Sequence, residues 1–76
     1  MERIKLIWDF RGQDAWSTAL HHKKHLLEYI AMEKLENADA DAKQLSDYHS
    51  TAYIVIPREK MIEVRDRLLP HRGELA

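Results

Sequence analysis

Apolar and polar side chains alternate along residues 3–10, with Ile7 as the one apolar exception on the polar side. The apolar positions are Ile4, Leu6, Trp8 and Phe10. A period of two residues places successive side chains on opposite faces of a strand. The pattern therefore predicts a strand over residues 3–10 with one apolar face, and a turn at residues 11–13 after it.

The following segment, residues 15–35, contains no glycine or proline and repeats its apolar side chains at helical spacing. Asp14 precedes it, and its carboxylate can accept hydrogen bonds from the free N–H groups of a first helical turn. Lys23 and Lys34 fall inside the apolar arc, where their aliphatic stems can lie along the core. We expect a long amphipathic helix whose core-facing side consists of Trp16, Ala19, Leu20, Leu26, Leu27, Ile30 and Ala31.

The middle of the chain is harder to divide. Residues 36–42 are acidic and have no clear period, which indicates a loop. Residues 51–56 are rich in β-branched side chains and tyrosine, which predicts a strand. The residues before this strand also have β character, and two arrangements fit residues 43–57. One is a hairpin with a turn near residues 47–50, and the other is one long bent strand.

The last third of the chain has a helix bounded by two prolines. Pro57 suits the first turn of a helix, because that turn does not need its missing N–H. Residues 58–69 carry apolar side chains at helical spacing, and Pro70 ends the helix. Residues 71–76 are long enough for one short terminal strand. The predicted order of elements is therefore β-α-β-β-α-β.

This order is typical of a ferredoxin-like α+β domain, a four-stranded antiparallel sheet with two helices on one face. We expect residues 1–76 to form one such domain. Ile7, Tyr53 and Val55 would leave the other face of the sheet partly apolar, and a chain this short commonly gains stability by association. The pattern predicts a homodimer. The alternative is that Tyr53 and Val55 are ordinary exposed strand residues.

Composition excludes several classes of function. Without cysteine there is no disulfide, thiolate metal site or cysteine nucleophile, and two glycines cannot form a glycine-rich phosphate loop. The 12 basic and 13 acidic residues give a net charge of −1, which does not favour a nucleic-acid partner. The longest apolar run, residues 52–56, is too short for a membrane span. We expect a cytoplasmic protein with no cofactor and no secretory signal.

Five histidines are the most unusual feature of the composition. Helical spacing places His21, His25 and Glu28 on one face of the first helix, which is compatible with a divalent metal site. A solvated helix face explains the same spacing more simply. His22 borders the apolar arc, where a half-buried histidine is expected. Convergence of these residues with the more distant His49 would support acid–base chemistry.

The polar face of the first strand offers a second constellation. Asp9 and Arg11 lie two residues apart there, and they could pair with each other or with His71 and Arg72 on a neighbouring strand. Beside a pocket, Arg11 or Arg72 could bind a small anion. The candidate acid–base residues are His22, His25 and His49. The candidate binding residues are Arg11, Tyr29, His71 and Arg72.

Three segments carry a resemblance to known proteins: residues 8–12 (Trp-Asp-Phe-Arg-Gly), His22-x-x-His25-Leu26, and residues 70–74 (Pro-His-Arg-Gly-Glu). Together they resemble a small bacterial family of proteins of unknown function. The order of elements is also similar to the YciI-like and dimeric α+β barrel proteins. That resemblance implies a homodimer with packed sheets and a histidine–aspartate pair as its site. His25 matches by its place in the helix, and no aspartate matches in the strand.

The sequence thus predicts a small homodimeric binding or accessory domain for a small-molecule ligand. One alternative is an enzyme that uses a histidine as general acid and base in a pocket between sheet and helix. The other is a domain that binds a divalent metal through the helix-face residues described above.

Overall fold

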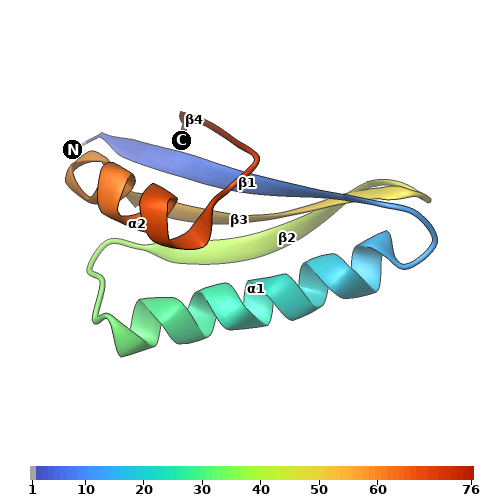
Figure 1. Ribbon diagram of the computed structural model, residues 1–76, viewed down its shortest axis with the longest axis horizontal. Coiled ribbons are helices and arrows are strands. Elements are labelled where there is room, and N and C mark those ends of the chain that lie inside the picture. The colour runs from blue at the N-terminus through green and yellow to red at the C-terminus, as the bar shows by residue number, and fades with distance from the viewer. Residues whose placement is uncertain (1) are drawn as a thin grey trace.

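The computed structural model describes residues 2–76 as one sheet with two helices (Figure 1). The elements are β1 (Arg3–Arg11), α1 (Ala15–Met32), β2 (Asp39–Ser46), β3 (His49–Pro57), the short 3-10 helix η1 (Arg58–Lys60), α2 (Met61–Leu68) and β4 (Arg72–Leu75). The strands pair antiparallel in the order β2-β3-β1-β4. The predicted ferredoxin-like α+β fold, with the order β-α-β-β-α-β, is confirmed.

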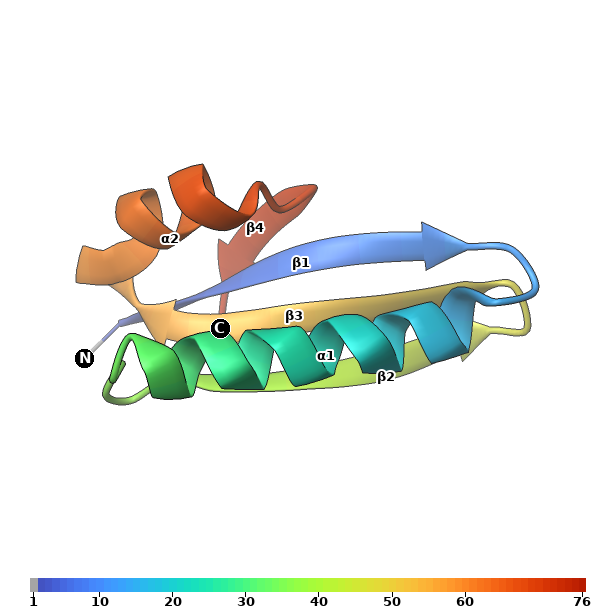
Figure 2. The same ribbon diagram turned by 60° about the horizontal axis from the view of Figure 1, so that its bottom comes forward.

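The core lies between the sheet and the two helices. The helix α1 runs along β2 and β3. The helix α2 lies toward the opposite edge of the sheet, beside β1 and β4 (Figure 2). The buried core residues are Leu6 and Trp8 of β1, Ala19 and Leu26 of α1, Ala40 of β2, Ala52, Ile54 and Ile56 of β3, and Val64 of α2. The apolar face predicted for the first strand is therefore the face that the helices cover. The opposite face, called here the open face, has no helix over it.

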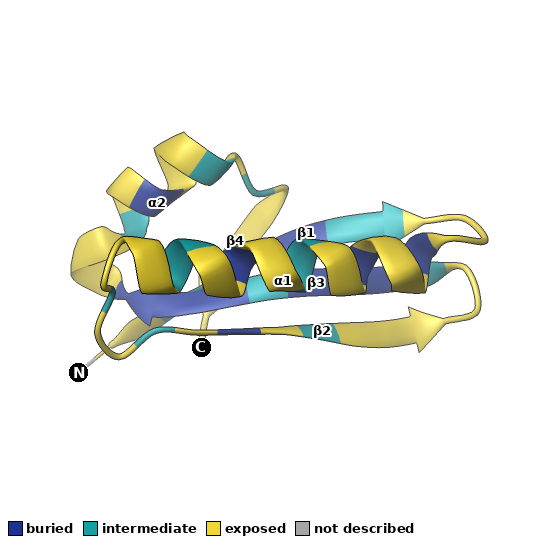
Figure 3. Ribbon diagram, turned by 90° about the horizontal axis from the view of Figure 1, so that it is seen from below, coloured by how far each residue is buried: buried dark blue, intermediate teal, exposed yellow. Residues whose placement is uncertain are grey.

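The helix α1 is rotated relative to the predicted apolar stripe (Figure 3). Its buried residues are Ala15, Ala19 and Leu26. The exposed residues of the predicted stripe are Trp16, Leu20, Leu27 and Ala31. The prediction was wrong for these four because the contact with the sheet is centred on Ala19 and Leu26, which lie on an adjacent side of the helix. The small Ala19 side chain lets the helix approach a sheet surface that contains Ala40 and Ala52.

The segment between α1 and β2 is shorter than predicted. The helix ends at Met32, and left-handed backbone at Lys34 (φ 53°) and Asn37 (φ 56°) turns the chain back toward the sheet. Residues 39–42, predicted as loop, are the first half of β2. Ala40 is buried under the helix, so packing outweighs the acidic composition of this segment.

A hairpin connects β2 and β3 through a turn at residues 47 and 48. The hairpin alternative is therefore correct, and the single long bent strand is wrong. The pairing shifts between Gln44 and Ser46, which gives β2 an irregularity just before the turn. After the turn, β3 continues in register with β1 from His49 to Pro57.

The first helix begins at Ala15 as predicted, but the predicted cap and the predicted start of the second helix need correction. Asp14 occupies the position before α1, but its carboxylate makes no capping hydrogen bond. Its main-chain oxygen accepts from Ser17 Oγ instead, at 3.1 Å. Pro57 is extended (ψ 145°) and ends β3, because it pairs with the first residue of β1. The helix predicted over residues 58–69 therefore begins as η1, and α2 starts only at Met61.

Candidate functional site

The candidate site lies on the open face of the sheet, where Asp9 joins side chains from two other strands. Nε2 of His49 lies 2.9 Å from Asp9 Oδ1. Arg72 donates to the same carboxylate from Nε, 2.9 Å from Oδ2, and from Nη2, 3.3 Å from Oδ1. Because β1 is the strand between β3 and β4, its carboxylate can hold one residue from each neighbour.

The charges in this cluster stabilise one another. Hydrogen bonds from Arg72, and then from His49, lower the pKa of Asp9 to about 2. The hydrogen bond to Asp9 also raises the pKa of Arg72. The Asp9 and His49 side chains are 19% and 21% exposed, so their hydrogen bond is partly shielded from water. Asp9 is therefore ionised at neutral pH, and a neutral His49 that donates from Nε2 has an unprotonated Nδ1.

Next to this cluster, a hollow of about 160 Å³ crosses all four strands of the open face. Its lining includes three cationic side chains and one acidic side chain, which are Lys5, Lys43, Arg72 and Glu74. The buried Ile7 and Thr51 also line it. Nζ of Lys5 lies 4.2 Å from the ring centre of Tyr53, a cation–π contact that keeps the ammonium group over the sheet. The hollow thus has an excess of positive charge.

Two further histidines lie near β1. Nδ1 of His71 accepts a hydrogen bond from the main-chain N–H of Asp9 at 2.9 Å. The His22 ring packs against Trp8 with 4.6 Å between ring centres, and against Phe10 with 5.6 Å. Burial, and then the charges of nearby histidines including His71, lower the pKa of His22. Its Nε2 is buried and has no hydrogen-bond partner among the described residues.

The histidines proposed for a metal lie on an exposed side of α1. Nε2 of His21 and Nε2 of His25 are 2.9 Å apart, and Glu28 lies 3.2 Å from the other nitrogen of His25. Glu28 therefore contacts a different edge of the ring from the one that meets His21. Within residues 2–76, no group of three or more histidine, aspartate or glutamate side chains has the arrangement of a metal site.

The structure thus separates the three candidate acid–base residues. His22 packs on the covered side of the sheet, His25 is exposed on α1, and His49 lies on the open face. They do not converge in one pocket, so the convergence that would have supported acid–base chemistry is not found among these three residues. Asp9 instead links two of the distant histidines, because its carboxylate holds His49 and its N–H is held by His71.

The candidate binding residues also divide into two groups. Arg72 pairs with Asp9, which was one of the two pairings expected from the sequence. Arg11 is exposed and makes no side-chain hydrogen bond or ion pair within the described part of the chain. Tyr29 packs half-buried at the edge of the core, where it raises the pKa of Arg67 together with Glu33. Neither Arg11 nor Tyr29 lines the open-face hollow.

Sequence reasoning missed Lys5, Lys43 and Tyr53 as parts of a site. The sequence pattern does place Lys5 and Tyr53 on the open face of their strands, because they alternate with core residues. Their proximity depends on the register that places Lys5 opposite Val55 and Ile7 opposite Tyr53. Lys43 lay at the start of the segment that the sequence did not divide.

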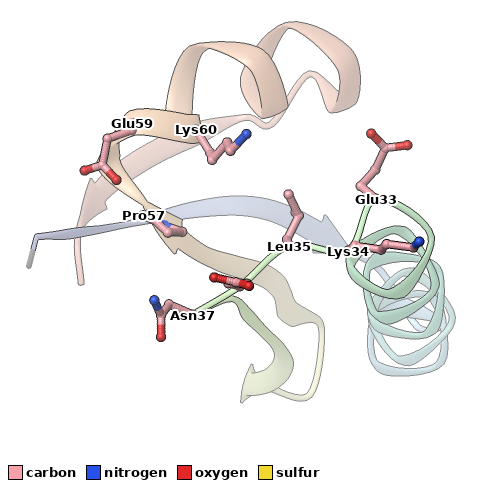
Figure 4. Close-up of a pocket in the computed structure, with 8 residues that line it drawn as sticks. Glu33, Lys34, Leu35, Asn37, Pro57, Glu59 and Lys60 are labelled. Atoms are coloured by element: carbon pink, nitrogen blue, oxygen red, sulfur yellow. The ribbon is translucent and has the colours of Figure 1, made fainter.

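A second hollow, of about 320 Å³, lies at the other end of the molecule (Figure 4). It separates the loop after α1 from η1, and Pro57 and Leu35 lie in its lining. Its charged residues are of both signs: Glu33, Lys34, Glu36, Glu59 and Lys60. None of the candidate residues lines this hollow, and its mixed charge does not select one kind of ligand.

No family model, curated protein or solved structure matches this chain. Of the resemblance described above, the structure supports the α+β fold, with its β-α-β-β-α-β order and four-stranded antiparallel sheet. No helix in the described residues has the length and apolar character needed to cross a membrane.

Proposed function

We propose that this protein is a small binding domain that takes a small anionic ligand, such as a phosphate- or carboxylate-bearing molecule, on the open face of its sheet. The observation that carries the proposal is the hollow lined by Lys5, Lys43 and Arg72. Three cations from three strands meet there over a buried floor, and only Glu74 opposes them in the lining.

The geometry gives each cation a defined place. Arg72 is held by two hydrogen bonds to Asp9, so less side-chain freedom is lost when it binds a ligand. Lys5 is placed by the ring of Tyr53 and by Glu74, 4.0 Å away. Lys43 has no carboxylate partner in the described structure and is the cation most available to an anion. A volume of 160 Å³ is the space of about five water molecules, which suits one small anionic group.

The experiment is a titration of the protein with inorganic phosphate, followed by the main-chain amide signals in NMR spectra. Saturable shifts are expected at residues 5, 43 and 72. Lys43→Gln removes the available cation and weakens binding by about tenfold or more, as expected for a charged hydrogen bond. Lys60→Gln is the matched control, since Lys60 lies at the other end of the molecule. Shifts that do not saturate, or that are the same in both variants, contradict the proposal.

A second candidate function follows from the Asp9–His49 pair. Asp9 holds Nε2 of His49 at 2.9 Å, and in this proposal Nδ1 accepts a proton from a ligand held near the hollow, whose lining includes Arg72 and Thr51. In this proposal His49 is the general base, and Arg72 keeps Asp9 ionised. The test is turnover of small phosphate and carboxylate compounds by the wild type and by His49→Gln. Absence of turnover, or equal turnover in both proteins, rejects this candidate and leaves binding as the function.

A further inference from the structure

The free edge of β2 and the exposed apolar residues of α1 form one continuous side of the molecule. The strand is the last in the sheet, so one of its edges has no neighbouring strand. The helix runs beside it along the whole strand (Figures 2 and 3). On this side, α1 exposes the apolar residues Trp16, Leu20 and Leu27, at 36, 41 and 42%, with Ala31 in the same row. A shallow hollow of about 510 Å³ is lined by Leu20, Leu27 and Ala31 of this row together with Lys23, Lys24 and Glu28.

We infer that this side, here called the α1–β2 side, is the surface by which two copies of the chain associate. The two β2 strands would pair antiparallel and form an eight-stranded sheet, and the two α1 helices would pack against each other above it. This goes beyond the proposed anion site, and the two surfaces share Lys43, which lines the open-face hollow and belongs to the edge strand β2.

Charge complementarity along β2 supports a second copy as the occupant. A two-fold axis beside Ala42 places Asp41 of one copy opposite Lys43 of the other, twice. Opposite charges at directly opposed positions of an antiparallel pair are favourable. In this register Asp41 lies between the partner's lysine and Lys23 of its own chain, which is already 3.2 Å away.

The hydrogen-bonding groups on the edge fit the same register. The N–H groups of Ala40 and Ala42 point away from β3, and the preceding carboxylates of Asp39 and Asp41 accept from them at 3.1 and 2.8 Å. The hydrogen bond from Ala42, and then the one from Lys23, lower the pKa of Asp41. With the axis beside Ala42, carbonyls of the second strand replace these carboxylates, and Asp41 becomes free for the cross-strand ion pair.

The apolar row of the helix matches its own copy about the same axis, with Lys23 and Lys24 flanking it. Lys23, midway along α1, contacts Asp41, so the middle of the helix lies beside the middle of the strand. An antiparallel helix pair centred there places Leu20 opposite Leu27 and the large Trp16 opposite the small Ala31. Because α1 lies over β2 and β3, and strands are about 4.8 Å apart, the two helix axes would be about 10 Å apart. Packed helices are separated by about 8–10 Å.

Light scattering during size exclusion, at about 100 µM chain, tests this contact. The inference predicts twice the 9.0 kDa chain mass for the wild type. Leu27→Glu places a charge at the centre of the helix contact and reduces the mass to that of one chain. Ile62→Glu is the control, because Ile62 is 59% exposed on α2 and outside the contact. A second variant pair tests the register: Asp41→Lys dissociates the dimer, and adding Lys43→Asp restores it.

Circular dichroism melts of each variant separate loss of association from loss of folding. A wild-type mass near 9.0 kDa overturns the inference. A dimer that survives both Leu27→Glu and Asp41→Lys also overturns it, since the contact then lies elsewhere. Phosphate binding is tested separately in Leu27→Glu, which leaves Lys43 and the open-face hollow unchanged.

Discussion

The main-chain N–H of Asp9 donates to Nδ1 of His71 at 2.9 Å, just beyond the last residue pair between β1 and β4. The pairing of the two strands ends at Ile7 and Arg72. Beyond it, the His71 ring accepts the hydrogen bond from Asp9 that a main-chain carbonyl of β4 would otherwise accept. A neutral ring is required, because a proton on Nδ1 removes the acceptor. The same aspartate holds His49 and Arg72 on the open face, so this edge and the candidate site share one residue.

The hydrogen bond between Asp9 and His71 predicts that His71→Ala accelerates amide exchange at Asp9. The variant removes the acceptor, and the N–H becomes free for exchange. The measurement is amide hydrogen exchange by NMR on both proteins at one pH. The N–H of residue 71 itself, which donates to Ile7 O at 2.9 Å, serves as the reference in the wild type. Equal exchange at Asp9 in both proteins contradicts the prediction.

Asp9→Asn should reduce stability in a pH-dependent way. The folded-state pKa of about 2 lies below the ordinary value of 3.8, so the unfolded chain binds this proton first as the pH falls. The contribution is present above about pH 4 and is lost toward pH 2, and it corresponds to about 2 kcal/mol at pH 7. Urea unfolding at pH 7 and pH 3 measures the difference. Asp66→Asn is the control, because Asp66 is exposed and, among residues 2–76, pairs only with its neighbour Arg65. A difference from the wild type that does not shrink at low pH contradicts the assignment.

His22→Leu should make the protein more stable and less sensitive to acid. The buried Nε2 has no partner among residues 2–76, and its removal relieves a penalty of about 1 kcal/mol. Burial lowers the folded-state pKa of His22, so as the pH falls below 6.5 the unfolded state takes up the proton first and stability decreases. In urea unfolding, the free energy of unfolding of the variant should fall less between pH 7 and pH 5 than that of the wild type. His21→Leu, on the exposed side of α1, should retain the acid sensitivity, and equal behaviour of the two variants would argue against a buried His22.

Gly12→Ala should destabilise the turn between β1 and α1. Gly12 has φ 115°, a conformation that residues with a Cβ rarely adopt. A Cβ there meets nothing within 4 Å, so the cost comes from the backbone and not from a clash. We expect a loss of about 1 kcal/mol or more in urea unfolding, compared with little change for the exposed neighbour in Gln13→Ala. An unchanged stability in Gly12→Ala would mean that this turn adopts another conformation.

Much of the fold could be predicted because local patterns coincide with tertiary contacts. The alternation from Ile4 to Phe10 defines β1 and its covered face, and the two prolines bound the second helical region. The rotation of α1 could not be predicted, since a count of apolar residues favours Trp16 and Leu20 over the alanines that pack. The start of β2 was missed because its sequence is acidic and has no strand pattern, and the burial of Ala40 under α1 is visible only in the structure.

The candidate site was predictable only in part. The pairing of Asp9 with Arg72 followed from two strands that present charged residues at their ends. The contact between Asp9 and His49 depends on the register of β1 with β3, and no dipeptide marks the turn at residues 47 and 48 that sets where β3 starts. Two apolar residues of the open face, Ile7 and Val55, are buried within the single chain, at 4 and 9% exposure. The reason first given for a homodimer through that face is therefore weaker than the sequence indicated.

The most direct test of an anion site on the open face is a crystal structure of the protein in bromide, with the anion located by its anomalous scattering. The account predicts a bromide peak in the hollow between Lys5, Lys43 and Arg72, and loss of that peak in Lys43→Gln crystals. Bromide peaks that lie only elsewhere on the surface, with the open-face hollow empty, would contradict it.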